Sequence, residues 1–166
     1  MADDNTPLAL YLAYYSDAGG AQLDYDDLKT LASTDAIKIE AIALITRDAE
    51  GKIDVEDNDH SGRRGAGIGA AVGLVVGAIF PPSLLGGAVA GGLVGGGTGS
   101  LVSRKHRKEI KADLEDKMPR NSSAVVAVFE MSWVAEVKKA LAHAQSVDED
   151  ELDDDGITAV KDANAA

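Results

Sequence analysis

The chain has 166 residues and a mass of 17.2 kDa, a length that suits one domain or one domain with an appendage. Hydrophobic residues make up 45% and charged residues 27%, which argues against wholesale disorder. The absence of cysteine excludes disulfides, thiolate metal sites and cysteine nucleophiles. The formal net charge of −12 argues against a nucleic-acid binder, because contacts with phosphates need a basic surface.

Charged residues are distributed unevenly along the chain. Residues 1–60 and 121–166 carry a large excess of acidic groups, whereas residues 61–120 are net basic. Within the basic third, residues 65–103 contain no charged side chain, although they hold 13 of the 18 glycines. Because a soluble core seldom needs so long an uncharged run, we interpret this stretch as an insertion into a folded domain.

The first predicted elements are a strand and a short helix. The N-terminus has no basic start, so we expect no secretory signal peptide. Residues 8–16 (LALYLAYYS) predict a buried strand, because they form a short run rich in leucine and tyrosine. After a turn, Asp24 is the expected N-cap of a helix that directs Leu28 and Leu31 inward.

The next residues predict a β-hairpin. Residues 48–51 (DAEG) have the composition of a turn, and residues 52–56 (KIDVE) form the expected return strand. The strand before the turn, residues 37–47, alternates between apolar and polar side chains. Its side chains expected on one face are Ile39, Ala41, Ala43 and Ile45.

Three elements are predicted after the uncharged stretch. Apolar residues recur every four positions from Ile110 to Met118, which predicts a helix that Pro119 ends. Residues 124–129 (AVVAVF) predict a strand. Ser132 is the expected cap of a final helix whose apolar face is Val134, Val137, Leu141 and Ala144.

This order of elements predicts an α+β fold. We expect a ferredoxin-like antiparallel sheet of four strands with helices on one face, into which a glycine-rich helical hairpin is inserted. The ferredoxin-like domain would comprise residues 1–62 and 104–146, and the apolar hairpin residues 63–103. Residues 147–166 are expected to be an acidic disordered tail, because a block of like charges stays solvated.

Glycines recur every four residues in two series within the uncharged stretch. On a helix this spacing gives each series one narrow face, and two such helices can pack backbone to backbone. Pro81 and Pro82 lie between the series and are the expected hairpin turn, because neither can donate the helical hydrogen bond. The glycines expected in this helix packing are Gly65, Gly69, Gly73, Gly77, Gly87, Gly91, Gly95 and Gly99.

The outer faces of the predicted hairpin are aliphatic and suit lipid better than water. The first arm, residues 65–80, would be about 24 Å long at the helical rise of ~1.5 Å per residue, against a hydrocarbon core of ~30 Å. The hairpin would therefore either span a thinned bilayer or enter one leaflet. The outward side chains of this arm are expected to be Ile68, Val72, Val75, Val76 and Ile79.

Basic residues flank the predicted hairpin at both ends. We expect them to contact anionic lipid head groups, or alternatively the acidic tail of the protein itself. The positive-inside rule would place them in the cytoplasm, together with the soluble domain and both termini. These residues are Arg63, Arg64, Arg104, Lys105, Arg107 and Lys108.

Four segments carry a resemblance to a known family: ALITRDAEGKIDV, SGRRGAGIGAAVGLVVG, the Pro-Pro turn and MPRNSSAVVAVFE. From about Leu8 to Gln145 the chain resembles the bacterial domain-of-unknown-function 1269 family, whose members are commonly labelled membrane proteins. The resemblance implies a ferredoxin-like domain with a glycine-rich insertion, and it implies no activity and no catalytic residues. The residues after Val147 and the Asp-rich N-terminus are expected to lie outside the shared pattern.

No chemical motif in the sequence predicts a catalytic, cofactor or metal site. A GxGxxA pattern begins at Gly65, but no acidic residue follows at ~20 positions, as a dinucleotide site would need. The three histidines fall in separate predicted elements without the spacing of metal ligands: His60, His106 and His143.

We therefore interpret the chain as a non-enzymatic, membrane-associated protein whose cytoplasmic domain is tethered by a self-associating glycine-zipper hairpin. Its expected partners are an anionic membrane and further copies of itself, without nucleic acid. The alternative is a soluble cytoplasmic homo-oligomer, a scaffold in which the hairpins of several copies form a central apolar bundle.

Overall fold

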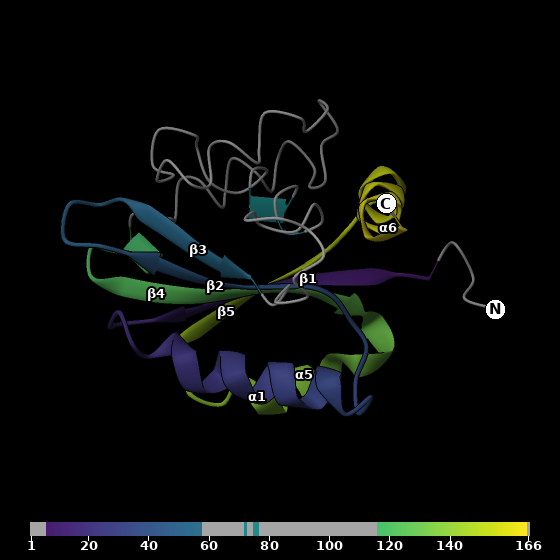
Figure 1. The fold of residues 1–166 in the computed structure, drawn as a ribbon, viewed down its shortest axis with the longest axis horizontal. Helices are drawn as coiled ribbons and strands as arrows, with labels where there is room; N and C mark the ends of the chain where they lie inside the picture. The colour runs from purple at the N-terminus through teal and green to yellow at the C-terminus, as the bar shows by residue number, and fades with distance from the viewer. Residues whose placement is uncertain (1–5, 58–71, 73–74, 77–115, 166) are drawn as a thin grey trace.

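The structure, a computed structural model, describes residues 6–57, Val72, Val75, Val76 and residues 116–165 (Figure 1). These residues form an α+β fold with an antiparallel sheet. Its strands are β1 (Leu8–Tyr15), β2 (Ile39–Arg47), β3 (Ile53–Asp57), β4 (Ser122–Glu130) and β5 (Ser146–Glu151). Its helices are α1 (Ala21–Ser33), the 3-10 turn η2 (Met131–Trp133), α5 (Val134–Ala140) and α6 (Asp154–Ala165).

The five strands lie in the order β3-β2-β4-β1-β5, and every neighbouring pair is antiparallel. All eight residues of β1 are buried, as are all residues of β4 except the last. Successive residues of a strand point to opposite faces, so two wholly buried strands require a cover on both faces. The prediction of an α+β antiparallel sheet is confirmed, but the sheet has five strands where four were expected.

One face of the sheet is covered by α1 and α5, which contact each other and both lie beneath the sheet in Figure 1. We call it the helix face. Its core includes an edge-to-face contact between Tyr11 of β1 and Phe129 of β4, whose ring centroids are 5.0 Å apart. The helices contribute these buried side chains to it: Ala21, Tyr25, Leu28, Val137 and, just after α5, Leu141.

The opposite face, which we call the valine face, is covered by segments far apart in the sequence. The strand residues buried in it include Leu10, Leu12, Ala41, Ala43, Val126 and Val128. They are covered by Met118, by three valines of the uncharged stretch, and by Leu152, Ile157 and Val160 from α6 and the residues before it. The expectation of helices on one face only is therefore wrong.

The predicted hairpin of β2 and β3 is confirmed, with one irregularity. The Asp48 carboxylate accepts hydrogen bonds from the backbone N–H groups of Glu50 and Lys52, and Gly51 adopts a φ of +86° that suits glycine. A register shift between Ile39 and Ala41 interrupts the alternation of β2. As a result Ile39 packs against the helix face, although it was expected beside Ala41.

Neither predicted helix cap is formed by the expected residue. Helix α1 begins at Ala21 after Gly20, and the backbone N–H of Ala21 donates to Ser123 Oγ at 3.1 Å. Asp24 instead lies within the first turn of α1 and is buried. The helix that was predicted to be the last, α5, is preceded by the 3-10 turn rather than capped by Ser132. Val137 and Leu141 of its predicted apolar face are buried as expected.

The expectation of a mobile acidic tail is also wrong, because residues 146–165 form β5 and α6. Lysines on both faces of the sheet pair with successive carboxylates of β5: Lys117 with Asp148 at 2.5 Å, and Lys138 with Glu149 at 2.7 Å. The Asp153 carboxylate accepts a hydrogen bond from the Gly156 N–H at the start of α6. These tertiary contacts and the burial of Leu152, Ile157 and Val160 outweigh the mutual repulsion of the acidic groups.

Candidate functional site

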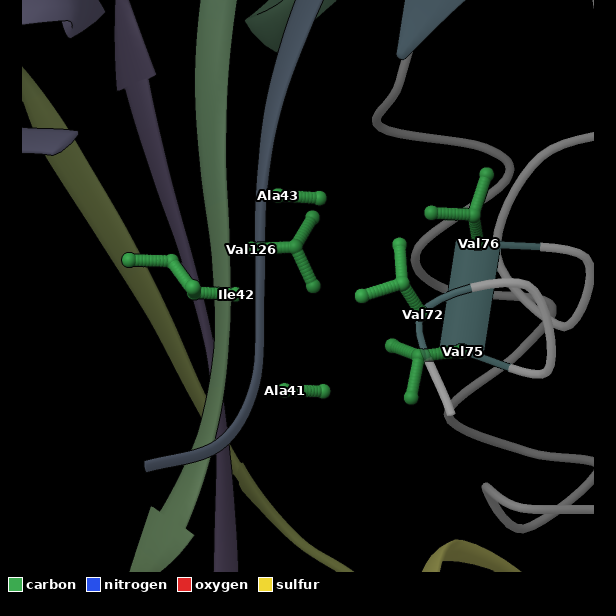
Figure 2. A pocket seen from close by; sticks show the side chains of 7 residues that line it. All are labelled: Ala41, Ile42, Ala43, Val72, Val75, Val76 and Val126. Atoms are coloured by element: carbon green, nitrogen blue, oxygen red, sulfur yellow. The ribbon is translucent and has the colours of Figure 1, made fainter. Parts of the chain in front are cut away.

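Three valines of the uncharged stretch pack directly on the valine face. Val72, Val75 and Val76 are 8%, 2% and 0% exposed. Figure 2 shows the side chains of Ala41, Ala43 and Val126 directed toward them, whereas Ile42 points to the opposite side of the sheet. The space between these side chains is too small to hold a water molecule. The valines and the sheet are therefore closely packed through apolar side chains, and the contact offers no cavity for a small ligand.

The small side chains of β2 make this close approach possible. Two alanines of β2 point toward the valines and alternate with residues that point to the other face. Because alanine side chains are short, the valines can lie close to the backbone of the sheet. The valines were expected on the outer, lipid-facing surface of the hairpin, whereas in this structure these three residues contact the sheet. They lie on the sheet because both of its faces are apolar, and the helices α1 and α5 cover only one.

The other residues predicted for the hairpin lie outside the described part of the chain. They are the packing glycines, Pro81 and Pro82, the outward Ile68 and Ile79, and the flanking basic residues Arg63, Arg64, Arg104, Lys105, Arg107 and Lys108. Within the described ranges, none of the helices is both long and apolar enough to cross a membrane.

A second cluster, on the helix face, joins a tyrosine, an aspartate and a histidine. The Asp24 side chain is fully buried, and its Oδ2 accepts the Tyr15 hydroxyl at 2.6 Å and the His143 backbone N–H at 3.0 Å. Asp24 Oδ1 lies 2.5 Å from His143 Nδ1. The His143 side chain itself is 60% exposed. A buried carboxylate therefore orients an imidazole that is itself largely exposed.

The electrostatics of this cluster favour a charged pair. The hydrogen bond to Asp24, and then the negative charge of the same carboxylate, raise the pKa of His143 above its usual 6.5. Burial, followed by the hydrogen bond to Asp24, raises the pKa of the Tyr15 hydroxyl, so this group remains a donor. An imidazole held in this way can exchange a proton or bind a ligand through Nε2. In the described residues, however, no group of three or more metal-ligating side chains comes together.

Sequence reasoning missed this cluster. His143 was treated only as one of three histidines without metal-ligand spacing, and Asp24 as a helix cap. One signal was present: Asp24 falls on the helical stripe of Ala21, Tyr25 and Leu28, which is the buried face of α1. A charged residue at such a position requires a partner, but its partner lies 119 positions away.

A comparison with protein families matches residues 66–163 to the family described as "Protein of unknown function (DUF1269)". No curated protein and no solved structure matches the chain. The family match contains all but the first residue of the uncharged stretch, and also β4, α5, β5 and nearly all of α6. The expectation that the acidic C-terminal residues lie outside the family pattern is therefore wrong, in agreement with their place in the fold.

Proposed function

This chain belongs to the DUF1269 family, and we propose that it is a non-enzymatic, membrane-associated protein whose uncharged stretch, residues 65–103, exchanges between its own sheet and a lipid bilayer. The observation that carries this proposal is the contact of Val72, Val75 and Val76 with the valine face. These side chains cannot contact the sheet and lipid at the same time, so membrane insertion of this segment requires its release from the sheet.

The finer fold assignment is part of the same proposal. Without β3, the strand order is β2-β4-β1-β5, with α1 and α5 on one face. This order supports a ferredoxin-like β-α-β-β-α-β unit in which α5 and β5 supply the last helix and strand. The uncharged stretch, together with β3, would then be inserted between β2 and β4, and we propose that it forms the glycine-packed hairpin.

The free energies of the two contacts are of similar size. Burial of a valine side chain contributes roughly 1.5–3 kcal/mol, whether the apolar surroundings are protein or lipid. Release would uncover Ala41, Ala43 and Val126, which are small side chains that expose little apolar area. The equilibrium of the segment between the sheet and the bilayer is therefore set by smaller contributions to the free energy.

Electrostatic attraction to the membrane would supply such a contribution to the free energy. The basic residues that flank the uncharged stretch each gain about 1 kcal/mol near an anionic membrane surface. The remainder of the chain is strongly acidic and is repelled by the same surface. We propose that Arg63, Arg64, Arg104, Lys105, Arg107 and Lys108 offset this repulsion and thereby select anionic membranes.

The exposed surface of the described residues also indicates which part of the chain could mediate self-association. Its exposed large hydrophobic side chains are Leu23 and Met131, one on α1 and one in the 3-10 turn. Two separate side chains do not make an apolar interface. We therefore propose that copies associate through the uncharged stretch. The alternative function, a soluble homo-oligomer built on a bundle of these segments, uses the same residues without a membrane.

A disulfide lock tests the exchange directly, because the chain has no cysteine of its own. In an Ala43→Cys/Val76→Cys variant, oxidation should hold the segment on the sheet and abolish flotation with anionic liposomes, and reduction should restore it. The matched control is Ala13→Cys/Val125→Cys, a cross-strand pair of β1 and β4 on the helix face. Oxidation of the control should leave flotation unchanged.

Equal flotation of the oxidised and reduced forms of the Ala43→Cys/Val76→Cys variant would overturn the proposed exchange.

A second variant distinguishes the membrane-associated protein from the soluble homo-oligomer. Changing all six flanking basic residues to glutamine should weaken flotation with anionic vesicles. If flotation is unchanged and only the mass measured by light scattering falls, the soluble oligomer is the correct function.

A further inference from the structure

The cluster of Tyr15, Asp24 and His143 connects three elements at one end of the sheet, and it is independent of the valine contact. Tyr15 is the last residue of β1, Asp24 lies in the first turn of α1, and His143 lies between α5 and β5. Both Asp24 oxygens accept hydrogen bonds, and two of the three donors belong to His143. The carboxylate therefore fixes the connection between α5 and β5 against α1.

The burial of Asp24 makes this contact depend on charge. A fully buried carboxylate needs a nearby positive charge or several donors, because its desolvation is costly. The other titratable groups that face His143 are Asp27 of α1 and, through Asp24, Tyr15 of β1. Lys138 of α5 pairs instead with Glu149 of β5. Among the described side chains, His143 is therefore the one that compensates the charge of Asp24 when its imidazole is protonated.

The imidazole is placed so that its charge can change without unfolding of the domain. With 60% of the side chain exposed, the ring can exchange its second proton with water. Neutral His143 can still donate one hydrogen bond from Nδ1, but it no longer carries the charge that opposes Asp24. Loss of the proton thus weakens the contact while the hydrogen-bonding geometry remains available.

The contact lies directly before an edge strand. The backbone N–H of Gln145 donates to the carbonyl oxygen of Tyr14 at 2.8 Å, and among the described strands β5 then pairs with β1 alone. On the valine face, the Tyr14 hydroxyl donates to Asp148 at 3.1 Å. Tyr14 therefore contacts β5 directly on the valine face, whereas Tyr15 acts on the residues before β5 through Asp24 on the helix face. An edge strand has one neighbour, so it opens more readily than the strands inside the sheet.

We propose that Tyr15, Asp24 and His143 form a proton-controlled latch, in which protonated His143 holds the start of β5 against α1 and loss of its proton releases it. The direction of the pH dependence follows from the hydrogen bond to Asp24, which raises the pKa of His143 in the closed state. The stabilisation is therefore complete below the open-state value of ~6.5 and disappears as the pH rises through the higher closed-state value.

The experiment is amide hydrogen exchange of residues 145–148 across the titration of His143, with the pKa of the ring followed by NMR. After correction for intrinsic exchange, the opening equilibrium should rise tenfold for each unit by which the His143 pKa exceeds its value in an Asp24→Asn variant. Amides in the middle of β4 should show no such change. In Asp24→Asn, the pKa should return toward 6.5 and the pH dependence of opening should disappear.

Two further variants keep the test decisive if Asp24→Asn does not fold. His143→Gln retains a hydrogen-bonding side chain without a titratable group, so the pH dependence should be lost. Tyr14→Phe is the matched control on the valine face: it should raise opening at every pH but leave the dependence on the His143 titration intact. Opening that is constant through the titration of His143, or that titrates equally in His143→Gln, would overturn the latch.

Discussion

The helix face and the valine face of the sheet both consist largely of apolar strand residues, but they are covered by very different segments. On the helix face, α1 follows β1 and α5 follows β4, each within a few residues. On the valine face, the cover comes from Val72, Val75 and Val76, from Met118 and from α6. The first cover is local in sequence, and the second is assembled from distant parts of the chain.

Polar groups are also distributed differently between the two faces. The helix face contains the buried Asp24 and its hydrogen bonds to Tyr15 and His143, which require one particular arrangement of α1 and the connection after α5. The valine contact consists of aliphatic side chains alone. Apolar packing without buried hydrogen bonds can be exchanged for another apolar surface, whereas a buried carboxylate cannot leave its donors without a large cost. The comparison supports the proposal that the helix face is fixed and that the contact of the three valines can be exchanged.

The largest expected effect is the loss of an aromatic anchor on the helix face. Phe129→Ala removes the ring that contacts Tyr11 and should lower the free energy of unfolding by about 3–5 kcal/mol. Urea unfolding followed by circular dichroism measures it. Met131→Ala, at a side chain that is 42% exposed, is the control and should change stability by less than about 0.5 kcal/mol. A loss below about 1 kcal/mol for Phe129→Ala would contradict a fixed helix face.

The helix face was also the more predictable face, because its signals are local. Leu28 of α1 and the apolar stripe of Val137 and Leu141 each depend on residues within a few positions of one another, and all three side chains are buried as predicted. The turn at Asp48 and Gly51 is local in the same way and also agrees with the structure. The strand at residues 124–129 was likewise predicted correctly, as part of β4.

The parts that sequence reasoning missed depend on tertiary partners. Strand β5 reads as a charge block, and its order depends on Lys117, Lys138 and the free edge of β1. The cover of the valine face was missed for a different reason. An aliphatic helix face has the same pattern whether it packs on lipid or on a sheet, so the sequence of residues 65–103 alone does not distinguish the two surroundings.

The second effect tests the buried carboxylate. Tyr15→Phe keeps the ring but removes the hydroxyl donor from Asp24, and the expected loss is about 1.5–3 kcal/mol because a buried charged acceptor loses a donor. Tyr14→Phe, on the valine face, should cost less, since its acceptor Asp148 is partly exposed and retains Lys117. Urea unfolding of the two variants gives the comparison. Equal losses of unfolding free energy in the two variants would mean that the hydrogen bond to buried Asp24 stabilises the fold no more than the hydrogen bond to Asp148.

The third effect concerns the valine contact. Val76→Ala removes two methyl groups from a fully buried position and should lower the free energy of unfolding by about 1.5 kcal/mol in the absence of lipid. Anionic vesicles offer the segment another apolar contact, so the difference from the wild type should shrink when they are present. Leu23→Ala, at a side chain that is 64% exposed, is the control. A loss at Val76 that vesicles do not change would indicate that the valine face is as fixed as the helix face.

The smallest effects compare the two lysines that hold β5 from opposite faces. The Lys117 and Asp148 side chains are 31% and 29% exposed, and the Lys117 Nζ also lies 5.8 Å from the centre of the Tyr14 ring. Lys117→Met, which keeps the apolar stem, should cost up to about 1 kcal/mol.

The Lys138 and Glu149 side chains are more exposed, at 51% and 47%, so water and salt screen their attraction more strongly. Lys138→Met should therefore have a smaller effect than Lys117→Met, and one that disappears at about 1 M salt, where the screening length is ~3 Å. Urea unfolding of both variants at low and high salt measures the difference. If the two lysines have equal effects that salt removes equally, β5 is ordered by general neutralisation of its acidic charge. If Lys117 retains an effect in salt, the partly buried contact with Tyr14 and Asp148 orders the strand, and the valine face contributes a fixed polar contact of its own.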